Sequence, residues 1–76
     1  MSEVEQSFDS QRMKIVEYLE QEGKGNKDAI WAYENIKEPP YKFASSDISA
    51  VLNGNRKYTK SVKWFITFLI KYFDLD

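Results

Sequence analysis

The chain has 76 residues and a formal net charge of -1, with 11 Lys and Arg against 12 Asp and Glu, and it contains neither Cys nor His. This composition leaves no disulfide framework, ordinary zinc site, thiol nucleophile or imidazole base, so we expect neither an enzyme nor a metal or cofactor. Its 5 Phe, 5 Tyr and 2 Trp supply apolar surface to bury, so one small domain, residues 1–76, can fold without disulfides or a structural metal.

The first predicted element is a helix that follows a short tail. Residues 1–6 are expected to be disordered, and Ser7 or Ser10 can cap a helix that runs to about Glu22. Apolar residues recur inside this stretch at helical spacing. The helix is expected to end at Gly23, because glycine readily adopts the left-handed conformation that follows a helix end.

A second, shorter helix is predicted after this turn. Asn26 can cap it, and Asp28 lies in its first turn, where a carboxylate suits the helix dipole. The apolar pattern continues to about Ile36. Pro39 and Pro40 then exclude a helix, since proline lacks the N–H group that a helix requires.

A third helix of about two turns follows the loop that contains these prolines. Ser45 or Ser46 can cap it, and the pair Asn53 and Gly54 ends it. Its apolar residues have the i, i+3, i+4 spacing of a helix face that packs on a core, and they are Ile48, Val51 and Leu52.

The last segment, residues 60–73, fits two patterns. Its aromatic and β-branched content favours a strand, whereas its length without a turn signal favours a helix. We expect a helix that is capped by Thr59. Its core-facing stripe would consist of Val62, Phe65, Ile66, Leu69 and Phe73.

Beside that stripe, a second apolar stripe is expected on the same helix. It would either pack on the first helix or form the interface with a second copy of the chain or another protein. Its members are Trp64, Phe68, Tyr72 and Leu75.

The sequence contains no pattern typical of a targeting or membrane-spanning segment. The N-terminal residues are acidic and polar, where a signal peptide would be basic and then apolar. The longest apolar stretch, residues 62–73, is shorter than the roughly 20 residues of a spanning helix. We therefore expect a cytoplasmic protein with no membrane partner.

The charges are unevenly distributed along the chain. Residues 1–22 hold six acidic and two basic residues, whereas residues 41–73 hold six basic residues and one acidic residue. This clustering is either a chance arrangement on a solvated surface or a basic face that meets phosphate. A near-neutral total therefore does not exclude a nucleic-acid partner.

A more specific pattern begins in the third predicted helix. An Ile-Ser pair is followed by Leu, Asn-Gly, a basic pair and a Thr-Lys start of the next helix, and these residues are Ile48, Ser49, Leu52, Asn53, Gly54, Arg56, Lys57, Thr59 and Lys60. The pattern resembles the recognition helix and following loop of lambda-repressor-like helix-turn-helix proteins of the Xre or Cro type, a family that includes HigA-like antitoxins. The resemblance covers residues 44–73.

The resemblance implies an all-α bundle of four to five helices that contains a helix-turn-helix with a lengthened turn. It also implies a sequence-specific regulator of bacterial, phage or mobile-element origin, a repressor or Cro-like protein, that binds double-stranded DNA as a homodimer. The third helix, residues 45–53, would lie in the major groove, which small polar side chains can approach closely. The expected DNA-binding residues are Lys42, Ser45, Ser46, Asp47, Ser49, Asn53, Asn55, Arg56, Lys57, Tyr58 and Lys60.

Two features depart from the family pattern. The second helix carries Trp31-Ala32 where members have a Leu-Ala pair, and the turn around Pro39 and Pro40 is longer by several residues. Asp47 could accept a hydrogen bond from a cytosine amino group, but it repels phosphate.

An alternative function is a protein-binding module, such as an antitoxin, an antirepressor or a phage-encoded inhibitor. The acidic first helix, the inserted loop at residues 39–43 and the second apolar stripe favour this function, because DNA binding requires none of them.

Overall fold

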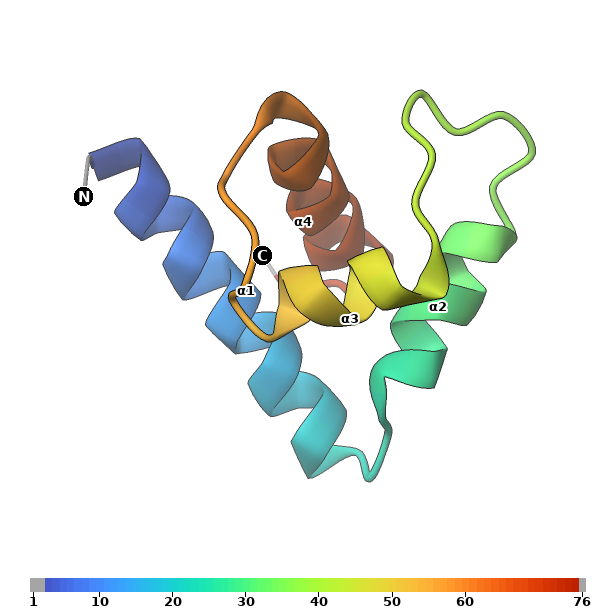
Figure 1. Cartoon of the computed structure of the whole chain (residues 1–76). Coiled ribbons are helices and arrows are strands. Elements are labelled where there is room, and N and C mark those ends of the chain that lie inside the picture. The colour runs from blue at the N-terminus through green and yellow to red at the C-terminus, as the bar shows by residue number, and fades with distance from the viewer. Residues whose placement is uncertain (1–2, 76) are drawn as a thin grey trace.

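Residues 3–75 form four helices joined by three connections (Figure 1). The computed structural model describes residues 3–75, with side chains from Gln6 onward, and these residues contain no strand. The prediction of an all-α fold is therefore confirmed, and so is the choice of helix for the last segment. The helices are α1 (Glu3–Gln21), α2 (Asn26–Glu34), α3 (Ser45–Leu52) and α4 (Lys60–Tyr72).

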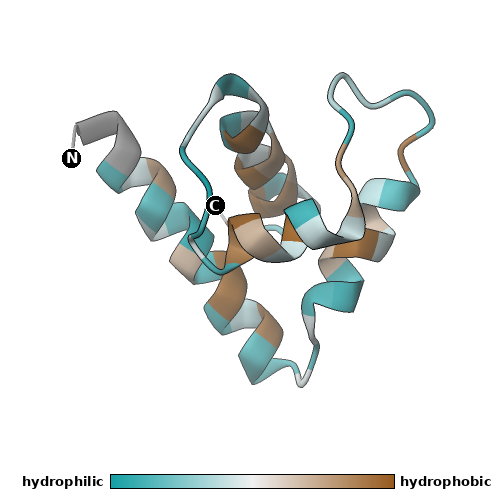
Figure 2. Cartoon of the chain, viewed as in Figure 1, coloured by the Kyte–Doolittle hydropathy of each residue, from teal (hydrophilic) through white to brown (hydrophobic). Residues whose placement is uncertain are grey.

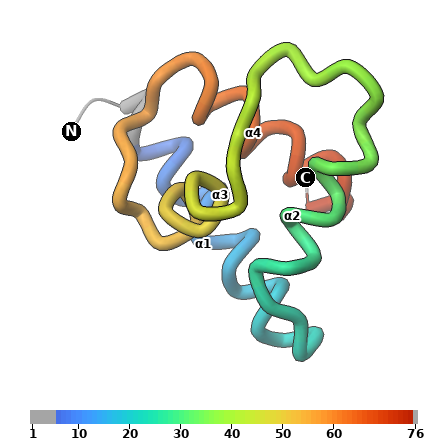
Figure 3. Tube along the Cα trace, turned by 45° about the vertical axis from the view of Figure 1, so that its right-hand side comes forward, coloured from blue at the N-terminus to red at the C-terminus, as the bar shows by residue number. Residues whose placement is uncertain are grey.

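The short helix α3 lies across α1 and α2, with α4 behind it (Figure 1). Helix α1 packs on α4 and α3, and α2 packs on α3 and α4. The connections before and after α3 both rise along the edge where α4 begins, as the turned view in Figure 3 also shows. The two connections, residues 35–44 and 53–59, therefore frame the same side of the molecule.

The core is built around α4, which buries residues along most of its length. Its ribbon is largely in the hydrophobic colours of Figure 2. Three of the apolar positions predicted for the third helix are buried, and four of the five predicted for the last helix are buried as well. Phe73 is only half-buried. The buried residues are Ile15, Leu19, Ala29, Ala32, Tyr33, Ile48, Val51, Leu52, Val62, Phe65, Ile66, Leu69 and Ile70.

The start of α1 differs from the prediction. The helix begins at Glu3, so Ser7 and Ser10 lie inside it and residues 3–6 are helical, whereas Met1 and Ser2 lie outside the described residues. Glu and Gln are good helix formers, and acidic residues suit the positive end of the helix dipole. Residues 3–6 therefore extend the helix to the N-terminal side of the serines.

The predicted caps of α2 and α3 were also wrong, while that of α4 is confirmed. Gly25 precedes α2 in an extended conformation, and Ala44 holds the corresponding position before α3. Helix α2 ends at Glu34, two residues before the predicted end. Before α4, the Thr59 hydroxyl accepts a hydrogen bond from the N–H of Val62 at 3.4 Å.

Candidate nucleic-acid interface

The outer side of α3 carries small polar side chains. Ser45, Ser46 and Asn53 are exposed and Ser49 is half-buried, while the opposite side of the helix packs into the core. Hydroxyl and amide groups can donate and accept hydrogen bonds at base edges and phosphates. Because α3 lies at the surface (Figure 1), this side of the helix is accessible to a large partner.

Asp47 holds together the first turn of α3 and the loop that follows the helix. Its Oδ2 atom accepts a hydrogen bond from the N–H of Ala44 at 3.0 Å, which completes the N-terminal cap that no serine provides. Its Oδ1 atom pairs with Nη2 of Arg56 at 3.0 Å. The sequence predicted both residues as DNA contacts, but in the protein alone each is the other's partner.

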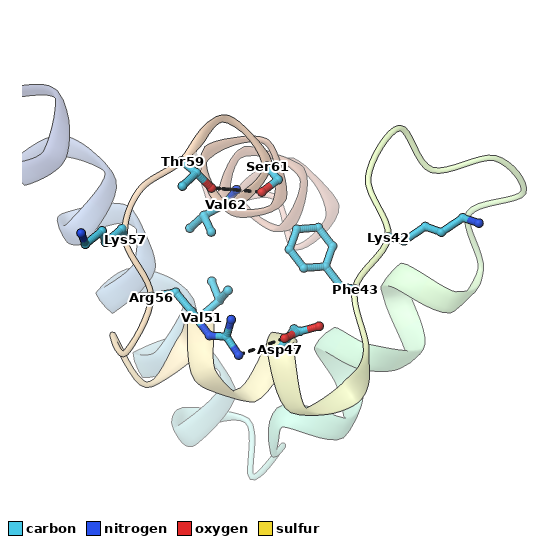
Figure 4. A pocket seen from close by; sticks show the side chains of 9 residues that line it. All are labelled: Lys42, Phe43, Asp47, Val51, Arg56, Lys57, Thr59, Ser61 and Val62. Carbon is cyan, nitrogen blue, oxygen red and sulfur yellow. Dashed lines mark hydrogen bonds and ion pairs between the residues drawn. The ribbon is translucent and has the colours of Figure 1, made fainter.

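A cavity of about 270 Å³ opens beside this ion pair (Figure 4). Four segments frame it: α3, the α3–α4 loop, the start of α4 and the end of the α2–α3 loop. The ring of Phe43 points into it, whereas Lys42 and Lys57 extend away from its centre (Figure 4). Its lining consists of Lys42, Phe43, Asp47, Val51, Arg56, Lys57, Thr59, Ser61 and Val62.

Four of the expected DNA-binding residues are basic, and three of these, Lys42, Arg56 and Lys57, border one hollow. The fourth, Lys60, is exposed in the first turn of α4 and follows Thr59, which lines the hollow. Asn55 is exposed in the same loop. The positive charges predicted from the sequence thus lie around the N-terminal half of α3 and the loop after it, but the charge of Arg56 is offset by Asp47.

Arg12 is an anchor that the sequence analysis missed. From α1 it donates hydrogen bonds to the carbonyl oxygen of Leu52 at 2.8 Å and to Asp9 at 3.1 Å. Its side chain is only 16% exposed. It also donates to the hydroxyl of Tyr58 at 3.3 Å, and that hydroxyl donates to Asp9 at 2.5 Å. These four residues form a clamp, which fixes the C-terminal end of α3 and the far end of its following loop to α1.

Gly54 is required where the clamp meets the end of α3. Its φ of +79° lies in the left-handed region, and a Cβ atom there would lie 3.2 Å from Cζ of Arg12. The N–H of Asn55 donates to the carbonyl of Ala50, which closes the helix end in a Schellman motif. The Asn-Gly pair signalled this turn in the sequence, but nothing there indicated the guanidinium packed against it.

Tyr58 serves the clamp, which differs from its predicted role in DNA binding. The hydrogen bond from its hydroxyl, followed by that from Arg12, lowers the pKa of Asp9. Burial, followed by the hydrogen bond to Asp9, raises the pKa of Tyr58 above its usual value of about 10. Tyr58 therefore remains protonated at neutral pH, and its hydroxyl is occupied by partners within the protein.

The long α2–α3 connection is fixed at its second half. The hydroxyl of Tyr33 donates to the carbonyl of Tyr41 at 2.6 Å and accepts from the N–H of Phe43 at 2.9 Å. The ring of Phe43 packs against Tyr33 and Phe65. These bonds fix the backbone on both sides of Lys42, just before α3 begins. The longer connection therefore does not leave the N-terminal end of α3 without support.

Three members of the second predicted stripe form an aromatic row with Tyr41. Trp64 lies 5.9 Å from Tyr41 and stacks on Phe68 at 5.5 Å, and Phe68 lies 5.8 Å from Tyr72, all measured between ring centroids. Tyr72 is 46% exposed, while the other three residues are half-buried. The row is thus partly accessible along one side of α4, most of all at Tyr72.

Leu75 does not belong to this row, contrary to the prediction. The helix ends at Tyr72, and Asp74 adopts a φ of +57°, which turns the chain. The N–H of Leu75 then donates to the carbonyl of Ile70, and its side chain packs against the core. The helical stripe therefore ends with Tyr72.

Comparisons with known proteins found no relative of the chain. No family model matches the chain, and neither a curated protein nor a solved structure matches it. Among residues 3–75, no helix is long and apolar enough to cross a membrane.

Proposed function

We propose that the protein binds double-stranded DNA in a sequence-specific manner and regulates transcription, with α3 in the major groove. The observation that carries the proposal is the two-sidedness of α3. Its buried side anchors the helix through Ile48, Val51 and Leu52, and its outer side presents small polar groups to the surroundings. A helix of this kind can approach base edges closely, because a groove about 12 Å wide leaves little room for long side chains.

The arrangement of charge supports the same function. Lys57 and Lys60 are exposed on the loop edge next to α3, and Lys42 is exposed on the neighbouring connection. Lysines beside a groove-binding helix fix its position by contacting phosphates, and they carry no sequence information themselves. Because Arg56 is paired, we assign most of the phosphate binding to the lysines.

The experiment is a binding titration with a pool of random-sequence duplex DNA across a series of salt concentrations. We expect binding at low salt that weakens as salt rises, because lysines that neutralise phosphates release counterions. Selection from the same pool would then recover preferred sequences. No binding of duplex at low salt would refute the proposal.

Replacing Lys57 and Lys60 together with alanine is expected to weaken duplex binding about tenfold or more. The slope of log affinity against log salt should become shallower by about 1.8, since each lost phosphate contact contributes about 0.9. Fluorescence anisotropy with labelled duplex measures both quantities.

The matched control replaces Lys24 and Lys71, which changes the net charge equally. Lys24 lies in the α1–α2 turn, and Lys71 lies at the opposite end of α4 from Lys60, about 16 Å along the helix. The control should keep the native salt slope. Equal losses in both double variants would mean that net charge alone, and no defined interface, governs binding.

The aromatic row favours a second candidate, a protein-binding function. Tyr41, Trp64, Phe68 and Tyr72 leave accessible apolar surface that DNA binding does not need. A second copy of the chain could cover it, which would place two α3 helices on a palindromic site with centres about 34 Å apart. Another protein could cover it instead, as an antitoxin, antirepressor or inhibitor would require.

A further inference from the structure

We infer that Asp47 restrains Arg56 and thereby limits the affinity of the protein for DNA of arbitrary sequence. The inference rests on the proposed DNA-binding function. In the free protein the Arg56 guanidinium is paired with Asp47, so a phosphate must displace the carboxylate before it can use this cation. Asp47 thus acts as an intramolecular competitor of the phosphate backbone.

The two partners are presented by backbone that is fixed on both sides. One carboxylate oxygen of Asp47 accepts the N–H of Ala44, which leaves the other oxygen directed at Arg56 (Figure 4). Arg56 belongs to a loop that the clamp holds at each end, through the carbonyl of Leu52 and the hydroxyl of Tyr58. Little backbone freedom is therefore lost when the pair forms. The fold itself thus places Asp47 where it competes with phosphate for Arg56.

The ion pair between Asp47 and Arg56 is weak enough for a DNA phosphate to take the place of the carboxylate. The side chain of Arg56 is 50% exposed and that of Asp47 is 36% exposed. Ion pairs as exposed as this contribute little to stability, because water and salt screen them. A phosphate can offer a guanidinium two parallel charge-assisted hydrogen bonds, so it can displace the carboxylate. The restraint therefore weakens binding without preventing it.

Asp47 lies on the side of the molecule that we propose binds DNA. Asp47 lies in the first turn of α3, beside the exposed Ser45 and Ser46, and it borders the same cavity as Arg56, Lys42 and Lys57. Its negative charge offsets one cation at the point where the positive charges gather. Removing that charge should therefore free Arg56 to bind phosphate of any sequence.

The test measures binding of random-sequence duplex by the native protein and by Asp47→Asn. Asparagine keeps an oxygen that can accept the N–H of Ala44, but it loses the charge. We expect the affinity to rise up to about fivefold, the equivalent of about 1 kcal/mol. The salt slope should steepen by up to about 0.9, the value for one added phosphate contact, because Arg56 is then in contact with phosphate for more of the time.

Two controls separate the restraint from simpler effects. Glu20→Gln removes one negative charge from an exposed position on α1, and it should leave affinity and slope unchanged. Asp47→Ser, a second uncharged residue that can accept the N–H of Ala44, should reproduce the gain, with thermal melts establishing that each variant is folded. The introduced asparagine could make a new contact with adenine, and duplex of random sequence prevents such a contact from dominating the measured affinity.

A double-mutant cycle identifies Arg56 as the target of the restraint. In an Arg56→Ala background, Asp47→Asn should no longer raise the affinity. A similar gain in both backgrounds would overturn the inference, because Asp47 would then act by repelling phosphate directly. If the native protein binds duplex and neither Asp47→Asn nor Asp47→Ser changes the affinity, the inference is also overturned, but the DNA-binding function stands. If none of the proteins binds duplex, the DNA-binding function and the inference are both refuted.

Discussion

Replacing Phe65 with alanine is expected to lower the free energy of unfolding by about 3–5 kcal/mol. Phe65 has no exposed surface, and its ring contacts those of Tyr33, Phe43 and Phe68 at centroid distances of 6.0, 5.1 and 6.4 Å. The substitution would leave a cavity where α2, α4 and the long connection meet. A domain of this length has a total stability of about 4–11 kcal/mol, so this single substitution would remove a large share of it.

The measurement is urea denaturation followed by far-ultraviolet circular dichroism. Phe68→Ala is the matched control, because it removes the same ring from the same helix at a half-buried position. We expect that control to lose less than about 2 kcal/mol. A loss at Phe65 no greater than that at Phe68 would contradict the described core.

Replacing Arg12 with alanine is expected to lower the free energy of unfolding by about 2–3 kcal/mol. The change removes charge-assisted hydrogen bonds and leaves the part-buried carbonyl of Leu52 without its side-chain donor. It also releases the loop at Gly54 and Tyr58. Lys14→Ala, an exposed position on the same helix, removes the same charge and should lose less than about 0.5 kcal/mol.

The dependence of stability on pH provides a second readout of the Arg12 substitution. The clamp lowers the folded-state pKa of Asp9, through Tyr58 first and Arg12 second. The resulting stability is present above the carboxyl pKa of the unfolded chain, and it is lost as pH falls through the folded-state pKa. In Arg12→Ala the pKa of Asp9 should rise toward its usual value, which makes this acid dependence weaker. An unchanged acid dependence would show that Arg12 does not act on Asp9.

The helices were predictable where local patterns determine them. The buried residues Ile48, Val51 and Leu52 follow a helical spacing that needs no knowledge of the rest of the chain. Thr59 caps α4 through a neighbour three positions away. The helical state of residues 60–73 was the harder choice, and the length of the segment decided it correctly.

The clamp and the ion pair were not predictable, because they join residues that are distant in the sequence. Arg12 and the carbonyl that it binds are 40 positions apart, and no local pattern marks such a pair. Asp47 was recognised as awkward beside phosphate, but the sequence alone did not show that Arg56 would return to pair with it. The serines suggested caps for α3, yet the acidic residue in the first turn supplies the cap.

The aromatic stripe was predicted in part. Trp64, Phe68 and Tyr72 follow one another along α4, as helical spacing requires. Tyr41 joins them from the inserted loop because Tyr33 fixes its backbone, and this contact depends on the tertiary fold. Leu75 leaves the stripe because the chain reverses at Asp74.

The claim that α3 and its neighbouring loop bind duplex DNA is tested by an NMR titration of the isotope-labelled protein with short duplex DNA at low salt. We expect that the amide shifts that change most belong to residues 45–53 and 55–60. Residues of the aromatic row should change little in that titration. Absence of any change on adding duplex, or changes confined to the aromatic row or to α1, would contradict the claim.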